Sequence, residues 1–186
     1  MTSPNPHAID ADTLSGMKPL RKVVFSLGSN LGDRLANLQS AVDAIRDTPD
    51  VIVVDISSVY ETAPVGAPEG SPDFLNLVIV GETTLEPRTL LERAQAIEDA
   101  FGRERSEPNS PRTLDVDLVM VGTTETQQGD LNLPHPRAHE RGFVLLPWAE
   151  VDPAAVLPGR GPIEPLIATV ETTGVAKRDD LVIEGD

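Results

Sequence analysis

Apolar residues form four short runs along the chain. The runs cover residues 22–27, 51–60, 74–80 and 114–121, are rich in valine, isoleucine and leucine, and lie between stretches that contain glycine, proline or polar residues. Runs of this length and composition, bounded by turn-forming residues, are typical of β-strands. The pattern therefore predicts four strands.

Two further stretches repeat apolar residues at helical spacing. The first follows Asp33, whose side chain can cap a helix, and the second begins near Pro87, which the first helical turn accepts, and ends near Gly102. Their apolar residues are Leu35, Leu38, Val42 and Ile45 in the first and Leu90, Leu91, Ala94, Ile97 and Phe101 in the second. The order β-α-β-β-α-β predicts an α+β protein with the ferredoxin-like arrangement, an antiparallel sheet covered by helices on one face.

The ends of the chain lack these patterns. Residues 1–21 mix proline, glycine and polar residues and are expected to form a disordered tail, and residues 171–186 are acidic and are expected to form a frayed one. The folded domain is expected to cover residues 22–170. After the fourth strand, a polar excursion over 123–134 and an apolar stretch over 143–150 predict a C-terminal hairpin and helix extension.

Charge and composition narrow the class of protein. The chain has 186 residues, no cysteine and a net charge of -15. This charge argues against binding to nucleic acid or to an anionic membrane, because a polyanion is repelled unless a local basic site opposes the field. Without cysteine there is no disulfide framework and no thiolate metal site. No apolar run approaches the roughly 18 residues of a membrane-spanning helix, so we expect a soluble, cytoplasmic protein. We also expect it to act as a monomer.

The fourth strand contains two aspartates that point the same way. Strand side chains alternate between faces, so Asp115 and Asp117 share one face, and Val116, Leu118 and Met120 lie on the other. Two neighbouring carboxylates repel one another and need a nearby arginine or divalent metal ions held by oxygen. The alternative is a solvated pair that protects an edge strand from aggregation. The pattern by itself leaves both interpretations open.

Four motifs together resemble one protein family. They follow the first strand, open the third strand, open the fourth strand, and follow the polar excursion. The motifs are Gly28-Ser29-Asn30-Leu31-Gly32-Asp33, Phe74-Leu75-Asn76, Pro111-Arg112-Thr113-Leu114-Asp115-Val116-Asp117-Leu118, and Leu133-Pro134-His135 with Arg141-Gly142-Phe143. In order and separation, over about residues 22 to 158, they resemble the 6-hydroxymethyl-7,8-dihydropterin pyrophosphokinases of folate biosynthesis.

The resemblance implies a reaction and a metal site. The reaction is transfer of a pyrophosphoryl group from ATP to the hydroxymethyl oxygen of the dihydropterin, with release of AMP. The resemblance also implies that Asp115 and Asp117 bind two magnesium ions that bridge the ATP phosphates. Magnesium favours a few carboxylates plus phosphate oxygens, so the chemistry of the two side chains agrees with this role.

The same resemblance assigns residues to the nucleotide. Transfer of a phosphoryl-type group relies mainly on positioning and charge stabilisation, so arginines are expected around the phosphates. The matching positions imply catalytic roles for Arg103 and Arg112. They imply ATP binding by Gln95, Arg112, Leu118, Asn132, His135 and Arg141. For Arg105 and Arg137, ordinary surface ion pairs are the favoured interpretation.

Five residues match the family's pterin site. A flat heteroaromatic ring needs stacking surfaces and hydrogen bonds at its edge. The resemblance implies that Phe74 and Phe143 stack on the ring and that Thr62, Val65 and Asn76 read its edge. Packing in the core is the alternative for both phenylalanines. The other aromatic residues expected in the core are Phe25, Phe101 and Trp148.

The loop before the fourth strand departs from the family pattern. Many members carry Arg-Trp-Gly before Pro-Arg-Thr, in a mobile loop whose aromatic residue closes over the pterin. This chain instead has Glu107-Pro108-Asn109-Ser110. Closure over the pterin is therefore expected to use different contacts.

Two other classes of protein stay open at this point. A palm-like nucleotidyltransferase also combines such a sheet with paired metal-binding carboxylates, but it releases pyrophosphate instead of AMP. A catalytically silent paralogue, or a ferredoxin-like protein that binds a small molecule, would keep the fold without the reaction. The nucleotide product distinguishes these classes.

Overall fold

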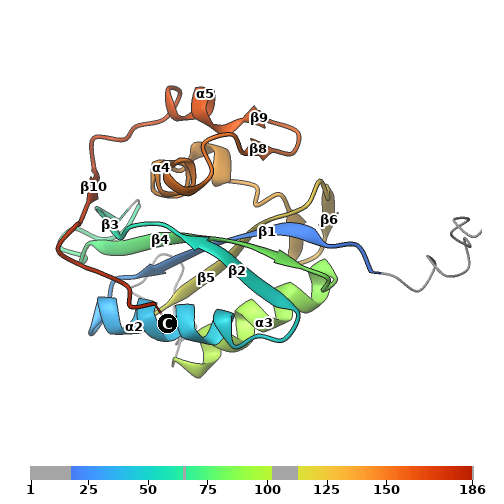
Figure 1. Cartoon of the computed structure of the whole chain (residues 1–186). Coiled ribbons are helices and arrows are strands. Elements are labelled where there is room, and N and C mark those ends of the chain that lie inside the picture. Colours follow the sequence, from blue (N-terminus) through green and yellow to red (C-terminus); the bar gives the residue numbers. More distant parts are fainter. Residues whose placement is uncertain (1–17, 65, 102–112, 186) are drawn as a thin grey trace, which may run out of the picture.

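The computed structural model describes residues 18–64, 66–101 and 113–185, and within them one six-stranded antiparallel sheet forms the centre of the molecule (Figure 1). The elements as far as the aspartate strand are β1 (Arg21–Ser29), α2 (Arg34–Arg46), β2 (Val51–Ile56), β3 (Tyr60–Thr62), β4 (Phe74–Thr83), α3 (Pro87–Ala100) and β5 (Asp115–Val121). With β2 and β3 counted as one divided strand, this is the predicted β-α-β-β-α-β order. The ferredoxin-like prediction is therefore confirmed.

The chain after β5 adds a hairpin and a second layer of short elements. They are β6 (Thr126–Gln128), β7 (Leu131–Leu133), the 3-10 turn η1 (Ala138–Glu140), α4 (Gly142–Val151), β8 (Val156–Leu157), β9 (Gly161–Pro162), α5 (Ile163–Ile167) and β10 (Val175–Lys177). The pair β6–β7 is the predicted hairpin, and α4 is the predicted apolar helix. No helix among the described residues has the length and apolar character needed to cross a membrane.

The strand predicted over residues 51–60 is divided in the structure. The strand order across the sheet is β10-β3-β4-β1-β5, and β2 also pairs with β4. Between β2 and β3, the hydroxyl of Ser57 accepts the backbone N–H of Val78 at 2.9 Å. As a result β2 pairs with the second half of β4, while β3 pairs with its first half.

Both long helices begin as the sequence predicts. The carboxylate of Asp33 accepts the backbone N–H of Ala36 at 3.0 Å and so caps α2. Pro87 occupies the first position of α3, where its missing N–H has no intrahelical partner to lose. The apolar stripes of both helices then pack against the same face of the sheet.

Helices cover both faces of the sheet, whereas the sequence predicts helices on one face. The first core cluster lies between the sheet and α2 and α3, and includes Leu27, Leu38 and Leu90. On the opposite face of the sheet lie α4 and α5 (Figure 1). A second cluster packs there and includes Val24 and the fully buried Trp148. Because α4 is apolar around most of its circumference, it adds a complete layer instead of a surface extension.

An irregularity in β5 changes the face of one residue. As predicted, Val116 and Leu118 pack in the first cluster, on the side opposite the aspartates. Met120, however, packs in the second cluster, together with Val119. The register of β1 with β5 shifts at this point, and the extra residue reverses the alternation beyond Leu118. The prediction for Met120 was therefore wrong.

The C-terminal segment is packed against the domain, contrary to the expected frayed tail. β10 pairs with β3, and the backbone N–H of Arg178 donates a 2.8 Å hydrogen bond to the chain just before β3. Farther along, Leu181 and Ile183 pack against the first core cluster, and Glu184 exchanges hydrogen bonds with Gln39 of α2. The segment thus passes around the edge of the sheet from the α4 side to the α2 side (Figure 1).

Deletion of residues 178–186 is expected to destabilise the domain. It removes the contacts of Leu181 and Ile183 with the core and the hydrogen bonds to α2, which together are worth about 2–4 kcal/mol. Urea unfolding of the shortened protein measures this loss. Deletion of residues 1–17, expected from composition to be a tail, is the control and should change the unfolding free energy by less than about 0.5 kcal/mol. Equal stability of the two shortened proteins would contradict the expectation.

Candidate functional site

The register of the sheet gathers polar residues on one face. Gly28 of β1 lies opposite Asn76 of β4 on one side and opposite Asp115 of β5 on the other. In the neighbouring row, Thr62 of β3 lies opposite Phe74 of β4. Side chains two residues apart in a strand share a face, so these groups all point toward the side that α4 covers. The same alternation predicts the shared face of the two aspartates.

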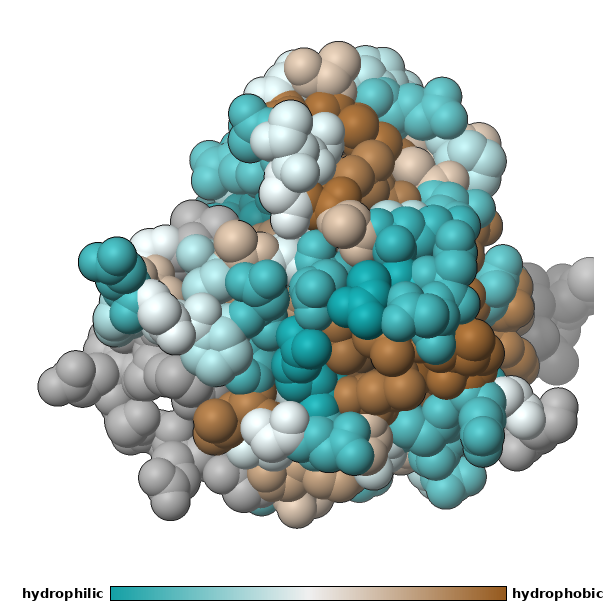
Figure 2. All heavy atoms as spheres, turned by 90° about the vertical axis from the view of Figure 1, so that its left-hand side faces the viewer, coloured by the Kyte–Doolittle hydropathy of each residue, from teal (hydrophilic) through white to brown (hydrophobic). Residues whose placement is uncertain are grey.

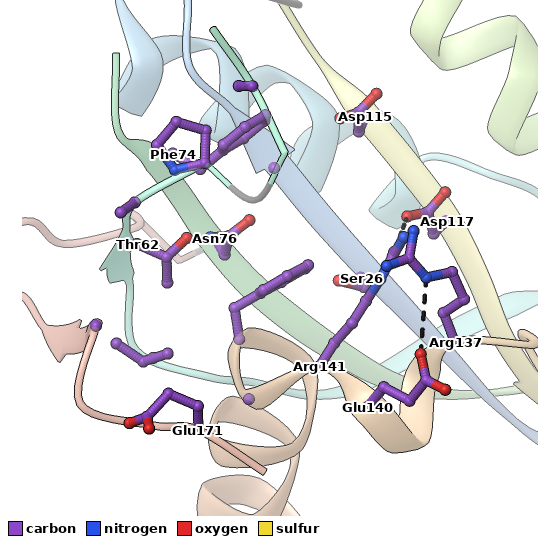
Figure 3. A pocket seen from close by; sticks show the side chains of 18 of the residues that line it. Ser26, Thr62, Phe74, Asn76, Asp115, Asp117, Arg137, Glu140, Arg141 and Glu171 are labelled. Carbon is purple, nitrogen blue, oxygen red and sulfur yellow. Dashed lines mark hydrogen bonds and ion pairs between the residues drawn. The ribbon is translucent and has the colours of Figure 1, made fainter. Parts of the chain in front are cut away.

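A cavity of about 620 Å³ opens on this face, between the sheet and the start of α4 (Figure 3). The sheet provides its floor, the turn around η1 and the start of α4 provide one wall, and the segment before β10 provides another. Its lining residues are Ser26, Gly28, Thr62, Ala63, Pro64, Ala67, Phe74, Asn76, Asp115, Asp117, His135, Arg137, Glu140, Arg141, Gly142, Phe143, Glu171, Gly174 and Val175. Eight predicted site residues therefore share one cavity.

One end of the cavity carries paired charges. Asp115 and Asp117 are half-buried on β5, and the guanidinium of Arg141 approaches the carboxylate of Asp117 at 3.6 Å (Figure 3). Burial lowers the pKa of Arg141, an effect that the charge of Asp117 opposes. An arginine stays protonated in proteins, so the pair combines negative and positive charge at one place. Arg141 also lies 5.4 Å from the centre of the Phe143 ring.

The aspartate pair suits a metal that shares its ligands with a phosphate. Among the described residues, no group of three or more histidine, cysteine, aspartate or glutamate side chains is close enough together to hold a metal ion. The pair Asp115 and Asp117 supplies carboxylate oxygens, the ligands that magnesium prefers. Magnesium ordinarily binds to one or two carboxylates and takes its other ligands from water and substrate phosphates. The two side chains therefore fit such an ion.

His135 stands beside the charged end in its neutral form. Burial, followed by the charges of Arg141 and Arg137, lowers the pKa of His135 from 6.5 to about 4. Its Nδ1 accepts the backbone N–H of Arg137 at 3.2 Å. Because Nδ1 is an acceptor, the proton of the neutral ring resides on Nε2. That nitrogen is then a hydrogen-bond donor.

The other end of the cavity carries a hydrogen-bonded pair and two aromatic rings. The side-chain amide of Asn76 donates to the hydroxyl of Thr62 at 2.7 Å, and both residues are buried (Figure 3). A Cβ atom at Gly28 would lie 2.7 Å from Oδ1 of Asn76, so glycine is needed there for the amide to fit. Phe74 and Phe143 are half-buried at this end. The arrangement offers flat apolar surfaces with polar groups between them, as a heteroaromatic ring requires.

Other predicted residues lie away from the cavity or outside the described part of the chain. Gln95 of α3 donates to Asp130 at 3.4 Å, Asn132 donates to the carbonyl of Gly129 at 3.2 Å, and Leu118 is buried in the first core cluster. These three are not among the described residues that line the cavity. Three more residues, and the loop sequence that departs from the family pattern, lie outside the described residues. They are Val65, Arg103, Arg112 and residues 107–110.

The structure adds residues that the sequence did not suggest. Arg137 pairs with Glu140 at 3.8 Å, as expected for a surface ion pair, but both residues also line the cavity (Figure 3). Glu171, Gly174 and Val175 reach the cavity from the segment expected to be a tail. In the sequence, only the β-branched side chain of Val175 favours a strand at this place. A three-residue strand is too short to show a periodic pattern.

Comparison with known proteins shows which family the chain resembles. A family model described as 7,8-dihydro-6-hydroxymethylpterin-pyrophosphokinase (HPPK) matches residues 24–153. The 2-amino-4-hydroxy-6-hydroxymethyldihydropteridine pyrophosphokinase of Mycobacterium tuberculosis is 43% identical over 165 residues, which cover 82% of this chain and 85% of the relative. The protein of the same name from Bacillus subtilis is 43% identical over 127 residues, which cover 68% of this chain and 75% of the relative.

Solved structures agree in fold. Plasmodium falciparum HPPK-DHPS superposes with a TM-score of 0.62 and 14% sequence identity, covering 84% of this chain and 46% of that chain. A second HPPK-DHPS, in complex with substrates, gives a TM-score of 0.62 and 12% identity, covering 81% of this chain and 43% of that chain. This chain therefore spans less than half the length of either solved protein. From the match over residues 24–153 and the relatives at 43% identity, the chain belongs to the 7,8-dihydro-6-hydroxymethylpterin-pyrophosphokinase family, the ATP-dependent diphosphotransferases of folate biosynthesis.

Proposed function

We propose that the cavity holds the two substrates side by side, with the pterin against Phe74, Asn76 and Phe143 and the ATP phosphates against Asp115 and Asp117. The observation that carries this proposal is the composition of this cavity, with an amide, a hydroxyl and two aromatic rings at one end and paired carboxylates with an arginine at the other. Asn76 and Asp115 flank the same residue of β1, so their strands are two inter-strand spacings, or about 10 Å, apart. A pterin ring with its hydroxymethyl group is of comparable length.

The reaction at this site is a direct displacement. The hydroxymethyl oxygen forms a bond to the β-phosphorus of ATP. The bond from that phosphorus to the oxygen shared with the α-phosphorus breaks, and AMP leaves with the electron pair. The hydroxyl proton passes to solvent. Asp115 and Asp117 would hold two magnesium ions, which when bound would withdraw negative charge from the phosphates. The chain's own contribution is to position both substrates and to supply charge.

Residues that line the cavity position the substrates and supply the charge. Asp115 and Asp117 hold the ions, Arg141 adds positive charge beside them, and Nε2 of His135 donates a hydrogen bond to a phosphate oxygen. On the pterin side, Thr62 and Asn76 hydrogen-bond the edge of the ring. The hydroxyl of Thr62 already accepts the amide of Asn76, so its own proton is available to a ring acceptor.

The remaining assignments from the family resemblance stay predictions. They are catalytic roles for Arg103 and Arg112, pterin binding by Val65, and ATP binding by Gln95, Arg112, Leu118 and Asn132. We also propose that the protein works as a monomer in the cytoplasm, without nucleic-acid or membrane partners. Sedimentation analysis at several protein concentrations tests the monomer.

The displacement itself is tested with ATP labelled at the β-phosphorus. After incubation with magnesium and the hydroxymethyl dihydropterin, AMP should be the nucleotide product and the label should be found on the pterin. Release of pyrophosphate would instead support a nucleotidyltransferase. ADP formation, or nucleotide turnover without the pterin, would also contradict the proposal.

Substitution of the aspartates tests the metal site. Asp115→Asn and Asp117→Asn keep the size of each side chain but remove the charge that binds magnesium, so turnover should fall at least about a hundredfold. Steady-state kinetics over a range of magnesium concentrations measures the loss. Asp179→Asn is the matched control, because the Asp179 side chain is 83% exposed, and it should retain activity. Near-normal turnover of Asp117→Asn would refute the assignment.

His135 is expected to stay uncharged at neutral pH. Its pKa is lower in the folded protein than in the unfolded chain, where it is about 6.5, so the unfolded chain takes up a proton first as the pH falls. The contribution of His135 to stability is therefore present above about pH 6.5 and lost as the pH falls toward 4. An NMR titration of the imidazole C–H signals, with His135→Asn for assignment, should give a midpoint near pH 4. A midpoint above pH 6 would contradict the neutral donor.

A further inference from the structure

The pterin end of the cavity is built at the two ends of one irregular connection. Thr62 is the last residue of β3, and Phe74 is the first residue of β4. The described residues of the connection, 63–64 and 66–73, form neither helix nor strand. Thr62 and Phe74 form the last pair of the β3–β4 ladder, so their separation depends on this pairing and on whatever braces its open end.

One arginine outside the cavity contacts both strand ends. Arg34 is the first residue of α2, and its Nη1 donates to the carboxylate of Glu61 at 2.8 Å and to the backbone carbonyl of Asp73 at 2.9 Å. Glu61 immediately precedes Thr62, and Asp73 immediately precedes Phe74. A single guanidinium group thus bridges the two strands next to the residues proposed to bind the pterin.

The same glutamate is held from a second side by the C-terminal segment. The other carboxylate oxygen of Glu61 lies 3.1 Å from the guanidinium of Arg178. Arg178 in turn forms two hydrogen bonds of 2.8 Å with the carboxylate of Asp180. The side chains of Arg34, Glu61 and Arg178 are only 25–31% exposed, so water screens these pairs less than it screens fully exposed ones.

These charged side chains lie behind the pterin site and not within it. In β3 the side chain of Glu61 points away from that of Thr62, toward the α2 side of the sheet. Among the described residues that line the cavity, none is Arg34, Glu61 or Arg178. Their elements meet on the side of the molecule shown in Figure 2, where hydrophilic residues gather across the middle of the face. Any effect on the substrate must pass through Thr62 and Phe74.

We propose that Arg34, Glu61 and Arg178 are positioning residues for the pterin end of the cavity. By fixing the chain just before Thr62 and Phe74, they hold the hydrogen-bonding edge and the stacking ring at the separation that the pterin needs. This inference rests on the proposed pterin site. It gives a role to the first turn of α2, which contributes no group to the cavity.

Kinetics of Arg34→Ala provides the test. Loss of two hydrogen bonds at the strand ends should raise the KM for the hydroxymethyl dihydropterin about five- to tenfold, while the KM for ATP changes less than about twofold. Arg34→Lys keeps a charged donor for Glu61 and should recover most of the pterin affinity. Glu61→Gln should show the same selective loss as Arg34→Ala, and it replaces that variant if Arg34→Ala does not fold.

Arg46→Ala is the matched control. Arg46 lies on the same helix, pairs with Asp43 at 3.7 Å and donates to the carbonyl of Glu184 in the C-terminal segment, but it contacts neither strand end. It should leave both KM values within about twofold of the wild type. Equal rises in both KM values, no rise for Arg34→Ala, or the same selective loss in Arg46→Ala would each overturn the proposal.

Direct binding separates this inference from the proposed function. Pterin affinity is measured by calorimetry in the presence of an ATP analogue with a methylene bridge between the α- and β-phosphorus, so no turnover is needed. Weaker binding by Arg34→Ala with normal binding by Arg46→Ala supports the positioning role. If the wild type binds the pterin and Arg34→Ala binds it equally well, only the positioning role fails. If the wild type does not bind the pterin, the proposed site and the positioning role both fail.

Discussion

The pairing of β1 with its two neighbours is the constraint on which the site depends. β4 and β5 both align with β1, and the alignment brings Asn76 and Asp115 to either side of Gly28. A shift of one residue in either pairing would turn one of these side chains into the core beneath α2 and α3. The apolar residues of β1 that fill this core, such as Leu27, hold the register because a slip would turn them toward the cavity and bring polar residues such as Ser26 into the core. Packing on one face of the sheet therefore determines chemistry on the other.

The segment from the end of β1 to the first turns of α2 hydrogen-bonds to the chain near both ends of the cavity. Ser29 and Asn37 both donate hydrogen bonds to the carbonyl of Thr113, just before the aspartate strand. On the other side, Asn30 donates to the carbonyl of Pro72, close to the start of β4. Behind the aspartates, the carboxylate of the buried Glu98 accepts the backbone N–H of Val116 at 2.8 Å. The motif that begins at Gly28 is thus a structural junction that reaches toward both substrate regions.

Much of this arrangement was predictable because it rests on local periodicity. Alternation in β5 predicts the shared face of Asp115 and Asp117, and the cap at Asp33 predicts the start of α2. The reversal at Met120 was not predictable, because an extra residue in one strand becomes apparent only when that strand is paired with its neighbour.

The second layer and the last strand were harder to predict for a related reason. An apolar stretch such as α4 does not reveal which surface it will cover, and β10 has only three residues, so its place at the edge of β3 follows from tertiary contacts. Arg137 illustrates the same difficulty within the site. Its ion pair with Glu140 is local and expected, whereas its position at the cavity depends on the fold of the whole chain.

The burial of Trp148 gives the protein a built-in optical probe. It is the only tryptophan of the chain, it is fully buried between its own helix α4 and the sheet, and its indole Nε1 has no hydrogen-bond partner among the described residues. An indole in such apolar surroundings emits at shorter wavelength than one in water. The helix that carries it also places Phe143, five residues earlier in the chain, at the cavity. Changes in the seating of α4 on the sheet should therefore alter the ultraviolet emission of the unlabelled protein, without interference from a second tryptophan.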